Sequence, residues 1–445
     1  MKEYRLLFIL LLFCCHIASA QKIEYSKGVV RIPATDDVQL IADIDGYHHL
    51  IHFPPYSKPV VSVFNDQLHL DKTIELNINL PANSDVKLVQ FSAYYIMYVH
   101  TRRTTRHQLI KITGDGTSED ISSIVNKPSD SLWNRSAVPF QLFNIDDSLY
   151  LVSHSYHDQI KKVRTAIVKL KRAQDIPEVN QVFSPFDSRY DALMEVTLLE
   201  NKLLVLKTSK DEEENNTLTL LKFDLLTGKQ LSRQFVNGKS KYISPSVRYS
   251  AADSGIFIYS LLTKPLGNNE ARPGIFMTRL NSSLNEVNPV SILPDVFRDN
   301  TAATFIAEQT QTSGWISFSY RVLDGYPATV SPAGIFMMLL NNRLEKAKDS
   351  LIKNKGRYFK IHPWPYSHFV LNNTSYLFLV EELAARRKGL LLVYPGKSSF
   401  ETISVRAYHR YNFALHLLQP VKDKYFIVPF TSKKEMGLMK VTLNN

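Results

Sequence analysis

Basic side chains beside aromatic ones recur along this chain. Three copies share a local pattern in which tyrosine follows arginine: Ser188-Arg189-Tyr190, Val247-Arg248-Tyr249 and His409-Arg410-Tyr411. Guanidinium groups bind carboxylate or sulfate groups through paired hydrogen bonds, and aromatic rings stack on sugar faces. The pattern predicts a site for an anionic or carbohydrate-like ligand. The predicted ligand-binding residues are Arg135, Arg189, Tyr190, Arg248, Tyr249, Arg298, Trp364, His368, Arg410 and Tyr411.

Two other functions fit the same residues. A lyase acting on uronate polysaccharides uses arginine to neutralise the substrate carboxylate and a tyrosine or histidine to remove the adjacent proton. Its candidate bases are Tyr190, Tyr249, His368 and His409. A protein-interaction scaffold would instead dock an acidic protein on a basic face. Arginines in a repeat can also be structural, bridging neighbouring units through carbonyls or through acids such as Asp187.

Three histidines, His52, His100 and His154, occupy equivalent places in three similar segments. Imidazoles can bind metals or carry protons, so this row is a candidate site whose role stays open. We expect no metal there, because equivalent strands of neighbouring repeats are too far apart for one tetrahedral ion. The sequence has no nucleophile elbow, phosphate loop, zinc-protease motif or cysteine cluster. No cofactor is therefore expected, and whether the protein is an enzyme is left open.

These residues belong to a repeat of about fifty residues. Short runs rich in β-branched and aromatic residues alternate with polar turns, which predicts an all-β chain. Segments 39–52 and 141–154 have the pattern of the same hairpin, each with an acidic turn. Eight runs mark the third strand of successive units, at 60–64, 109–112, 166–170, 220–223, 274–277, 334–337, 390–393 and 437–441. Eight four-stranded units predict a β-propeller, with seven blades as the alternative.

The two ends of the chain complement each other. The last unit stops after its third strand, whereas residues 23–32 precede the first unit and have no unit of their own. An N-terminal strand that completes the last unit would close the ring and cover an exposed edge. The repeat resembles, at the level of the fold, the secreted and periplasmic β-propeller repeat proteins. No subfamily motif is present, so the resemblance assigns no residue roles.

The meander places the candidate site on one face. In four-stranded units the loop after the second strand and the connection to the next unit emerge together. The opposite face has short turns such as Asp45-Gly46 and Asp146-Asp147. We therefore expect the ligand at the face that carries the connections between units, around the entrance to the central channel.

The first twenty residues predict export. Lys2 and Arg5 precede an apolar run at 6–17, which is too short to span a bilayer and is followed by Ala18-Ser19-Ala20. We expect residues 1–20 to be a signal peptide, with a membrane anchor as the alternative, and residues 21–445 to be a single propeller domain. Both cysteines lie in the first segment. An exported chain without cysteine indicates a periplasmic, cell-surface or extracellular protein, of bacterial origin.

Composition limits the partners. With 44% hydrophobic and 21% charged residues, the chain falls outside the collagen-like and disordered classes. The net charge is +11, or +10 once residues 1–20 are removed. Export argues against nucleic acid as the partner of this basic protein, which leaves an acidic or neutral polysaccharide or an acidic protein. No second apolar stretch is long enough for a transmembrane segment in the mature chain.

Overall fold

A computed structural model of the chain describes residues 22–33, 37–55, 57–78, 80, 84–101, 107–124, 141–170, 178–199, 201–250, 254–263, 274–292, 302–309, 316–324, 331–341, 344, 346–353, 366–371, 374–382, 388–395, 400–405, 411–422, 424–432 and 434–443. In these residues the regular structure consists of antiparallel strands and three short 3-10 turns, η1 (Ser122–Ile124), η2 (Asp158–Ile160) and η5 (Leu415–Leu417). No described helix is long and apolar enough to cross a membrane.

The described strands form eight sheets, numbered here in chain order. Sheet 1 contains β3 (Asp37–Ile44), β4 (Tyr47–Phe53), β5 (Val60–Asn65) and β6 (Leu70–Glu75), and sheet 2 contains β7 (Ser84–Gln90), β8 (Tyr94–Thr101), β9 (His107–Thr113) and β10 (Ser118–Asp120). Sheet 3 contains β11 (Gln141–Ile145), β12 (Ser148–His157), β13 (Lys162–Leu170) and β14 (Glu178–Pro185), and sheet 4 contains β15 (Asp191–Leu199), β16 (Lys202–Lys210), β17 (Asn216–Asp224) and β18 (Gln230–Val236).

Sheet 5 contains β19 (Lys241–Ser250), β20 (Gly255–Thr263), β21 (Gly274–Leu280) and β22 (Glu286–Ile292), and sheet 6 contains β23 (Ala302–Gln309), β24 (Ile316–Asp324), β25 (Ser331–Leu340) and β26 (Lys346–Lys353). Sheet 7 contains β27 (Tyr366–Leu371), β28 (Thr374–Glu382), β29 (Lys388–Pro395) and β30 (Phe400–Val405). Sheet 8 joins β31 (Asn412–Phe413), β32 (Gln419–Val421), β33 (Tyr425–Ser432) and β34 (Glu435–Thr442) to β1 (Lys22–Tyr25) and β2 (Val30–Arg31) from the other end of the chain.

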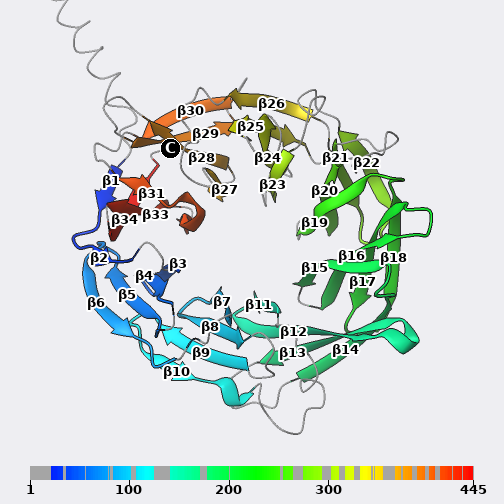
Figure 1. The fold of residues 1–445 in the computed structure, drawn as a ribbon, viewed down its shortest axis with the longest axis horizontal. Helices are drawn as coiled ribbons and strands as arrows, with labels where there is room; N and C mark the ends of the chain where they lie inside the picture. The colour runs from blue at the N-terminus through cyan, green and yellow to red at the C-terminus, as the bar shows by residue number, and fades with distance from the viewer. Residues whose placement is uncertain are drawn as a thin grey trace, which may run out of the picture.

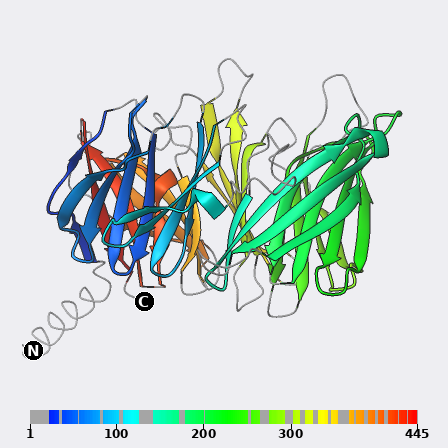
Figure 2. The ribbon, with the colours of Figure 1, turned by 90° about the horizontal axis from the view of Figure 1, so that it is seen from below.

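The sheets stand around a central axis, with the first strand of each innermost (Figure 1). Seen from the side, they form one layer whose strands run between two faces (Figure 2). The predicted all-β propeller is thereby confirmed, because radially arranged antiparallel meanders define that fold. All eight predicted third strands lie in third strands of the sheets, from β5 at 60–65 to β34 at 435–442.

The two compared hairpins have matching tight turns. In the β3–β4 turn, Asp45 has φ 51° and Gly46 has φ 82°, and in the β11–β12 turn Asp146 and Asp147 have φ 50° and 57°. Positive φ at both central residues defines a type I′ turn, which suits the twist of a two-residue hairpin. Aspartate tolerates this conformation better than most residues with a side chain.

Neighbouring sheets pack through apolar side chains that alternate along each strand. Leu50 contributes to a cluster shared with sheet 8 that includes Ile427, whereas the next residue, Ile51, contributes to a cluster shared with sheet 2 that includes Met97. Both faces of the second strand are therefore buried, and Leu50 and Ile51 are 1% and 0% exposed. This two-sided burial explains why second strands such as β20 are almost continuously apolar, whereas β4 buries three histidines among its apolar residues.

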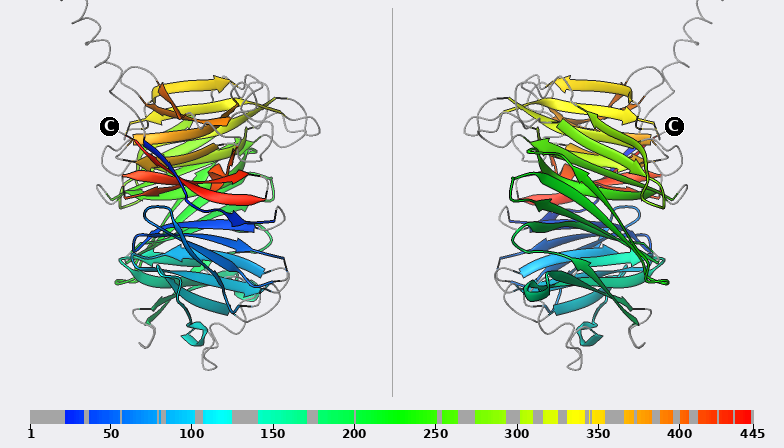
Figure 3. Two further views of the ribbon diagram at one scale, coloured as in Figure 1. Left: turned by 90° about the vertical axis from the view of Figure 1, so that its left-hand side faces the viewer. Right: turned by 90° about the vertical axis from the view of Figure 1, so that its right-hand side faces the viewer.

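The ring closes where the two ends of the chain meet. β1 pairs antiparallel with β34 from Lys22 opposite Thr442 to Tyr25 opposite Met439, and β2 continues along the same strand. The predicted closure by residues 23–32 is confirmed by this pairing. Figure 3 shows the N-terminal strands beside the C-terminal one. Between β1 and β2, the Lys27 amide donates to the Leu68 carbonyl of sheet 1 at 3.0 Å, so the segment joins both sheets.

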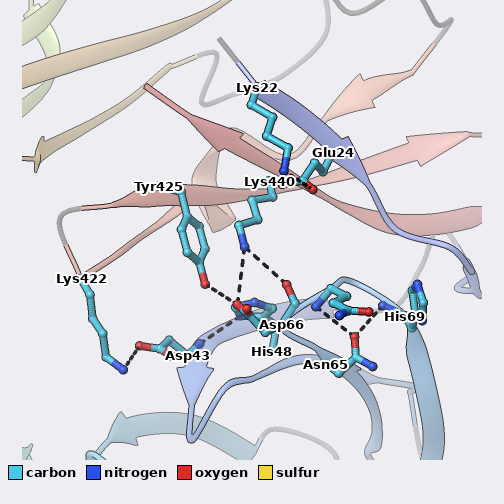
Figure 4. A network of polar contacts seen from close by, with 11 residues as sticks. Lys22, Glu24, Asp43, His48, Asn65, Asp66, His69, Lys422, Tyr425 and Lys440 are labelled. Carbon is cyan, nitrogen blue, oxygen red and sulfur yellow. Dashed lines mark hydrogen bonds and ion pairs between the residues drawn. The ribbon is translucent and has the colours of Figure 1, made fainter. Parts of the chain in front are cut away.

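Polar side chains reinforce the seam between sheets 8 and 1 (Figure 4). The Tyr425 hydroxyl donates to Asp66 at 3.1 Å, and the Lys440 ammonium lies 3.5 Å from the same carboxylate oxygen and 4.0 Å from the centre of the Tyr425 ring. Lys422 forms a second ion pair across the seam with Asp43 at 2.8 Å. Both ion pairs include an exposed partner, so the apolar cluster and the main-chain pairing contribute more stability.

We predict that deleting residues 22–32 lowers the melting temperature by several degrees or makes the protein aggregate. The deletion removes the strand that pairs with β34 and leaves an unpaired sheet edge. Thermal unfolding and size-exclusion chromatography measure the two outcomes. An unchanged melting curve with unchanged solubility would show that the seam does not depend on this segment.

A single substitution tests the same seam with less disruption. Gly28 has φ 151°, and a Cβ added there would lie 2.9 Å from the Leu70 Cβ. Gly28→Ala should therefore lower stability by about 1 to 3 kcal/mol through strain and overlap. The matched control is Gly238→Ala, at φ 53° with nothing within 4 Å of the added atom. If the two variants lost equal stability, the overlap with Leu70 would contribute nothing, and close packing at Gly28 would not matter for the seam.

Candidate functional site

The connections between sheets share one face of the ring with the loops between second and third strands, and we call it the loop face. The turns between first and second strands and between third and fourth strands lie on the other face, the turn face. On the loop face, residues 185–191 connect sheet 3 to sheet 4. This connection carries the predicted pair Arg189 and Tyr190.

Asp187 organises this connection. Its carboxylate accepts hydrogen bonds from Nε and Nη2 of Arg189 at 3.1 and 2.8 Å, and the Lys161 ammonium lies 3.0 Å from the oxygen that accepts Nη2. These two cations hold the pKa of Asp187 well below its usual range, the Arg189 hydrogen bonds having the largest effect. The guanidinium carbon also lies 5.2 Å from the centre of the Tyr190 ring. Arg189 is therefore oriented, although 64% of its side chain is exposed.

A buried ion pair fixes the end of the connection. The Lys207 ammonium contacts Asp191 at 2.8 Å and donates to the Pro185 carbonyl at 3.1 Å. The same carboxylate oxygen of Asp191 accepts the Asp187 amide at 3.0 Å. Both side chains of the ion pair are about nine-tenths buried. Removal of either partner would leave an uncompensated charge, so the pair constrains the backbone that carries Arg189.

Apolar side chains lie in and next to the segments that carry Lys161 and Arg189. The ring of Tyr156, on β12, lies 4.9 Å from the ring of Phe186 in the connection. Ile160 and Phe183 are 59% and 48% exposed, on the β12–β13 turn and on β14. Lys161 links the turn to the connection, because its carbonyl accepts the Phe186 amide at 2.9 Å. We define the Arg189 patch as Tyr156, Ile160, Lys161, Phe183, Phe186, Arg189 and Tyr190.

The predicted position of Arg248 is wrong. The sequence placed it in the connection that enters an inner strand, but it lies inside β19, paired with Phe257 close to the turn that follows. Its guanidinium contacts Glu195 of sheet 4 at 3.0 Å, and the other oxygen of Glu195 accepts the Val247 amide at 2.6 Å. Arg248 therefore bridges two inner strands. Arg189 and Arg248 lie at opposite ends of neighbouring inner strands and do not form one cationic ring.

Three other predicted residues are placed by the structure. Tyr249 lies next to Arg248 near the end of β19, on the turn face, so its predicted place on the loop face is also wrong. The ring of Tyr411 stacks on Phe430 at 4.4 Å and lies 6.0 Å from Tyr25, within the packing of sheet 8. His368 belongs to β27 and not to the loop before it. Arg135, Arg298, Trp364, His409 and Arg410 lie outside the described residues.

The histidine row is buried and divided among different interfaces. Strand alternation directs His52 with Leu50 toward sheet 8, His100 with Tyr98 toward sheet 3, and His154 with Val152 toward sheet 4. Their exposed fractions are 8%, 1% and 5%. This arrangement separates the three imidazoles. Within the described residues, no three His, Cys, Asp or Glu side chains form a group that could hold a metal ion.

Burial keeps several histidines neutral. Burial lowers the pKa of His154 and of His48 to about 4, although Asp66 and Asp43 oppose the shift at His48. Burial and the neighbouring His100 lower the pKa of His107 to about 4, and His107 Nδ1 lies 2.8 Å from the Tyr98 hydroxyl. The neutral ring can accept that hydrogen bond.

Side chains on the inner strands join adjacent sheets, and sequence reasoning missed them. Gln90 on β7 donates to the Ala42 carbonyl of β3 at 2.7 Å, and Gln419 on β32 accepts the Ala42 amide at 2.8 Å. Asn144 on β11 continues the series by donating to the Gln90 carbonyl at 2.7 Å. An amide side chain inside an inner strand was the available signal, but its partner lies 48 residues away for Gln90, 54 for Asn144 and 377 for Gln419.

Comparisons with known proteins do not assign the chain to a family. No family model and no curated protein matches the chain. Among solved structures, it is similar to the WD40 domain of SCAP from fission yeast, with 7% identity, a TM-score of 0.44 and coverage of 96% of this chain and 98% of that one. The propeller domain of the Trilobed protease from Pyrococcus furiosus gives 11%, 0.44, 84% and 99%, and a lectin from Burkholderia pseudomallei gives 10%, 0.44, 87% and 99%. At these values, no ligand or activity is transferred.

We predict that stability falls as the pH decreases from 6.5 to about 4. His48, His107 and His154 have folded-state pKa values of about 4, below the ordinary value of 6.5. The unfolded chain therefore binds more protons in this window, and each histidine accounts for up to about 3 kcal/mol of stability that is present above pH 6.5. His154→Gln keeps a polar partner for Thr165 but cannot titrate, so its unfolding free energy should depend less on pH. An identical slope in the variant would contradict the assignment.

Proposed function

We propose that the protein is an exported, non-catalytic propeller that binds an acidic polysaccharide on its loop face, with the Arg189 patch as part of the site. One observation supports this most strongly: Asp187 fixes the Arg189 guanidinium beside the Tyr190 ring while most of the arginine remains exposed. A ligand would meet a cation and an aromatic face that are already oriented. Such preorganisation reduces the entropy lost on binding.

The guanidinium keeps donors for a ligand. Asp187 engages Nε and Nη2, and within the described part of the chain Nη1 has no hydrogen-bond partner. Lys161 supplies a second exposed cation, held by the same carboxylate. The three groups have a net charge of +1, which favours a ligand carboxylate or sulfate group. The exposed rings of Tyr190 and Tyr156 offer surfaces for the apolar faces of sugar rings.

The location of the protein belongs to the same proposal. A basic segment, a short apolar run and a small-residue motif open the chain, and both cysteines lie within the run. We infer export through a cleaved signal peptide to the periplasm or cell surface of a bacterium, where acidic polysaccharides are available. The net charge of +10 after cleavage favours such ligands over neutral ones.

A matched pair of arginine variants tests the site. Arg189→Ala should weaken binding of polygalacturonate or another acidic polysaccharide by about 1 to 3 kcal/mol, the range of a lost charge-assisted hydrogen bond, with an unchanged melting temperature. The control is Arg233→Ala on the outer strand β18, because Arg233 is also exposed, paired with Glu286 and 6.0 Å from a Phe235 ring. It should leave affinity unchanged. Calorimetry in low and high salt should show weaker binding as salt increases.

Other outcomes distinguish the alternatives. Equal affinity in wild type and Arg189→Ala would exclude the Arg189 patch. If the protein released unsaturated products that absorb in the ultraviolet, it would be a uronate lyase and not a non-catalytic binding protein. If the protein bound an acidic protein but no polysaccharide, and Arg189→Ala weakened that binding, the protein would be an interaction scaffold.

A further inference from the structure

Two lysines and a tyrosine meet on the turn face between sheets 4 and 5, away from the Arg189 patch. Lys202 and Lys222 are diagonal neighbours on β16 and β17, because Lys202 pairs with Asp224 and Leu204 pairs with Lys222. Lys202 is two residues from Leu204 and Lys222 is two residues from Leu220, and both leucines belong to the apolar cluster shared with sheet 5. The two lysines therefore lie on the side of sheet 4 that faces sheet 5. Tyr249, near the end of β19, faces them from sheet 5.

Lys222 is a buried cation. Its exposed fraction is 8%, and its ammonium donates to the Ser282 carbonyl at 2.5 Å. Among the described residues, no carboxylate forms an ion pair with it. Lysine is almost never fully buried without a charged partner, because desolvation of an ammonium is costly. Burial accordingly lowers the pKa of Lys222, and the nearby Lys202 lowers it further.

Lys202 and Tyr249 complete the arrangement. The Lys202 ammonium lies 3.5 Å from the Tyr249 hydroxyl and 5.5 Å from the centre of its ring. A hydrogen bond from Ser254 lowers the pKa of Tyr249, and both lysines add to this effect. The hydroxyl therefore lies in a positive field.

The carboxylate of Asp224, next to these lysines, is hydrogen-bonded within its own turn. Asp224 accepts the amides of Leu226 and Thr227 at 3.1 and 2.9 Å, so its carboxylate caps the β17–β18 turn. Lys229 in that turn is exposed and adds a third ammonium near Lys222. Three lysines and one aspartate leave a local charge of +2.

We propose that Lys202, Lys222 and the Tyr249 hydroxyl form a binding site for a tetrahedral oxyanion, a sulfate or phosphate group, at the seam between sheets 4 and 5 on the turn face. Two ammonium groups and a hydroxyl, carried by three strands, supply donors from different directions, as an anion with several oxygens requires. The anion would provide Lys222 with the charged partner that it otherwise lacks. This site is separate from the proposed polysaccharide site on the loop face.

Inorganic sulfate and phosphate are the first probes, with sodium chloride at matched ionic strength as the reference. Wild-type protein should bind sulfate by calorimetry, and Lys202→Met or Lys222→Met should weaken binding at least tenfold, with a smaller loss in Tyr249→Phe. Lys434→Met is the matched control, because Lys434 is exposed in the β33–β34 turn of sheet 8. It should retain wild-type affinity, as should Arg189→Ala.

The fold of the key variant can be checked directly. Lys222→Met replaces a buried ammonium with an apolar side chain of similar length, so without sulfate it should melt at the wild-type temperature or higher. With sulfate, it should gain less than the wild type. Sulfate also stabilises most proteins weakly by exclusion from the surface, and the gain that remains in Lys222→Met reports that background. Lys434→Met keeps the site and should gain as much as the wild type.

A second arm distinguishes the source of the anion. A sulfated oligosaccharide that binds more tightly than inorganic sulfate, with the same losses in the lysine variants, would indicate a group carried on a chain. Equal affinities would indicate the free ion. Wild-type protein that binds neither sulfate nor phosphate, or lysine variants that bind as tightly as the wild type, would overturn the site. Neither result depends on polysaccharide binding at Arg189.

Discussion

The pairing of β1 with β34 is the constraint on which the rest of the ring depends. Without it, β34 would present an unpaired edge, and the N-terminal segment would lose its contacts with sheet 8 and with Leu68 of sheet 1. The two cysteines of the chain lie outside the described residues, so the seam described here is held by main-chain hydrogen bonds, the apolar cluster around Leu50 and Ile427, and the Tyr425, Asp66 and Lys440 contacts. Closure by non-covalent pairing makes the ends of the chain interdependent.

Polar side chains then set how each sheet meets the next. Gln90, Asn144 and Gln419 satisfy main-chain groups of neighbouring inner strands, and Glu195 with Arg248 does so between sheets 4 and 5. Because apolar packing is not directional, these hydrogen bonds help to define the register between sheets. The role of an arginine likewise depends on whether its donors bond a neighbouring strand. An arginine whose donors are used between strands is structural, whereas Arg189 is held by its own loop and remains exposed.

The sequence predicted the architecture well because its signals are local. Alternation and turn residues located all eight third strands, and the shared hairpin pattern located the short turns at Asp45-Gly46 and Asp146-Asp147. The missing last strand and the unassigned residues 23–32 predicted closure, because an exposed edge needs a partner. These features depend on residues close in the chain or on the number of strands per unit.

The candidate site was less predictable because it depends on where strands begin and end. Arg189-Tyr190 and Arg248-Tyr249 look alike, yet β15 begins after the first pair and β19 contains the second. Their acidic partners differ in distance: Asp187 is two residues from Arg189, whereas Glu195 lies 53 residues before Arg248 on another sheet. Nor did any local signal show that Lys202, Lys222 and Tyr249 would meet across two sheets.

Hydrogen exchange along the strands of sheet 8 tests the closure most directly. In the full-length protein, amides of β34 should exchange as slowly as those of β5, because both are third strands paired on two sides. They should exchange more slowly than those of outer strands such as β6 and β10. Exchange of β34 at the rate of these outer strands would mean that β1 does not stay paired with it, and the account of a ring closed by its N-terminal strand would be contradicted.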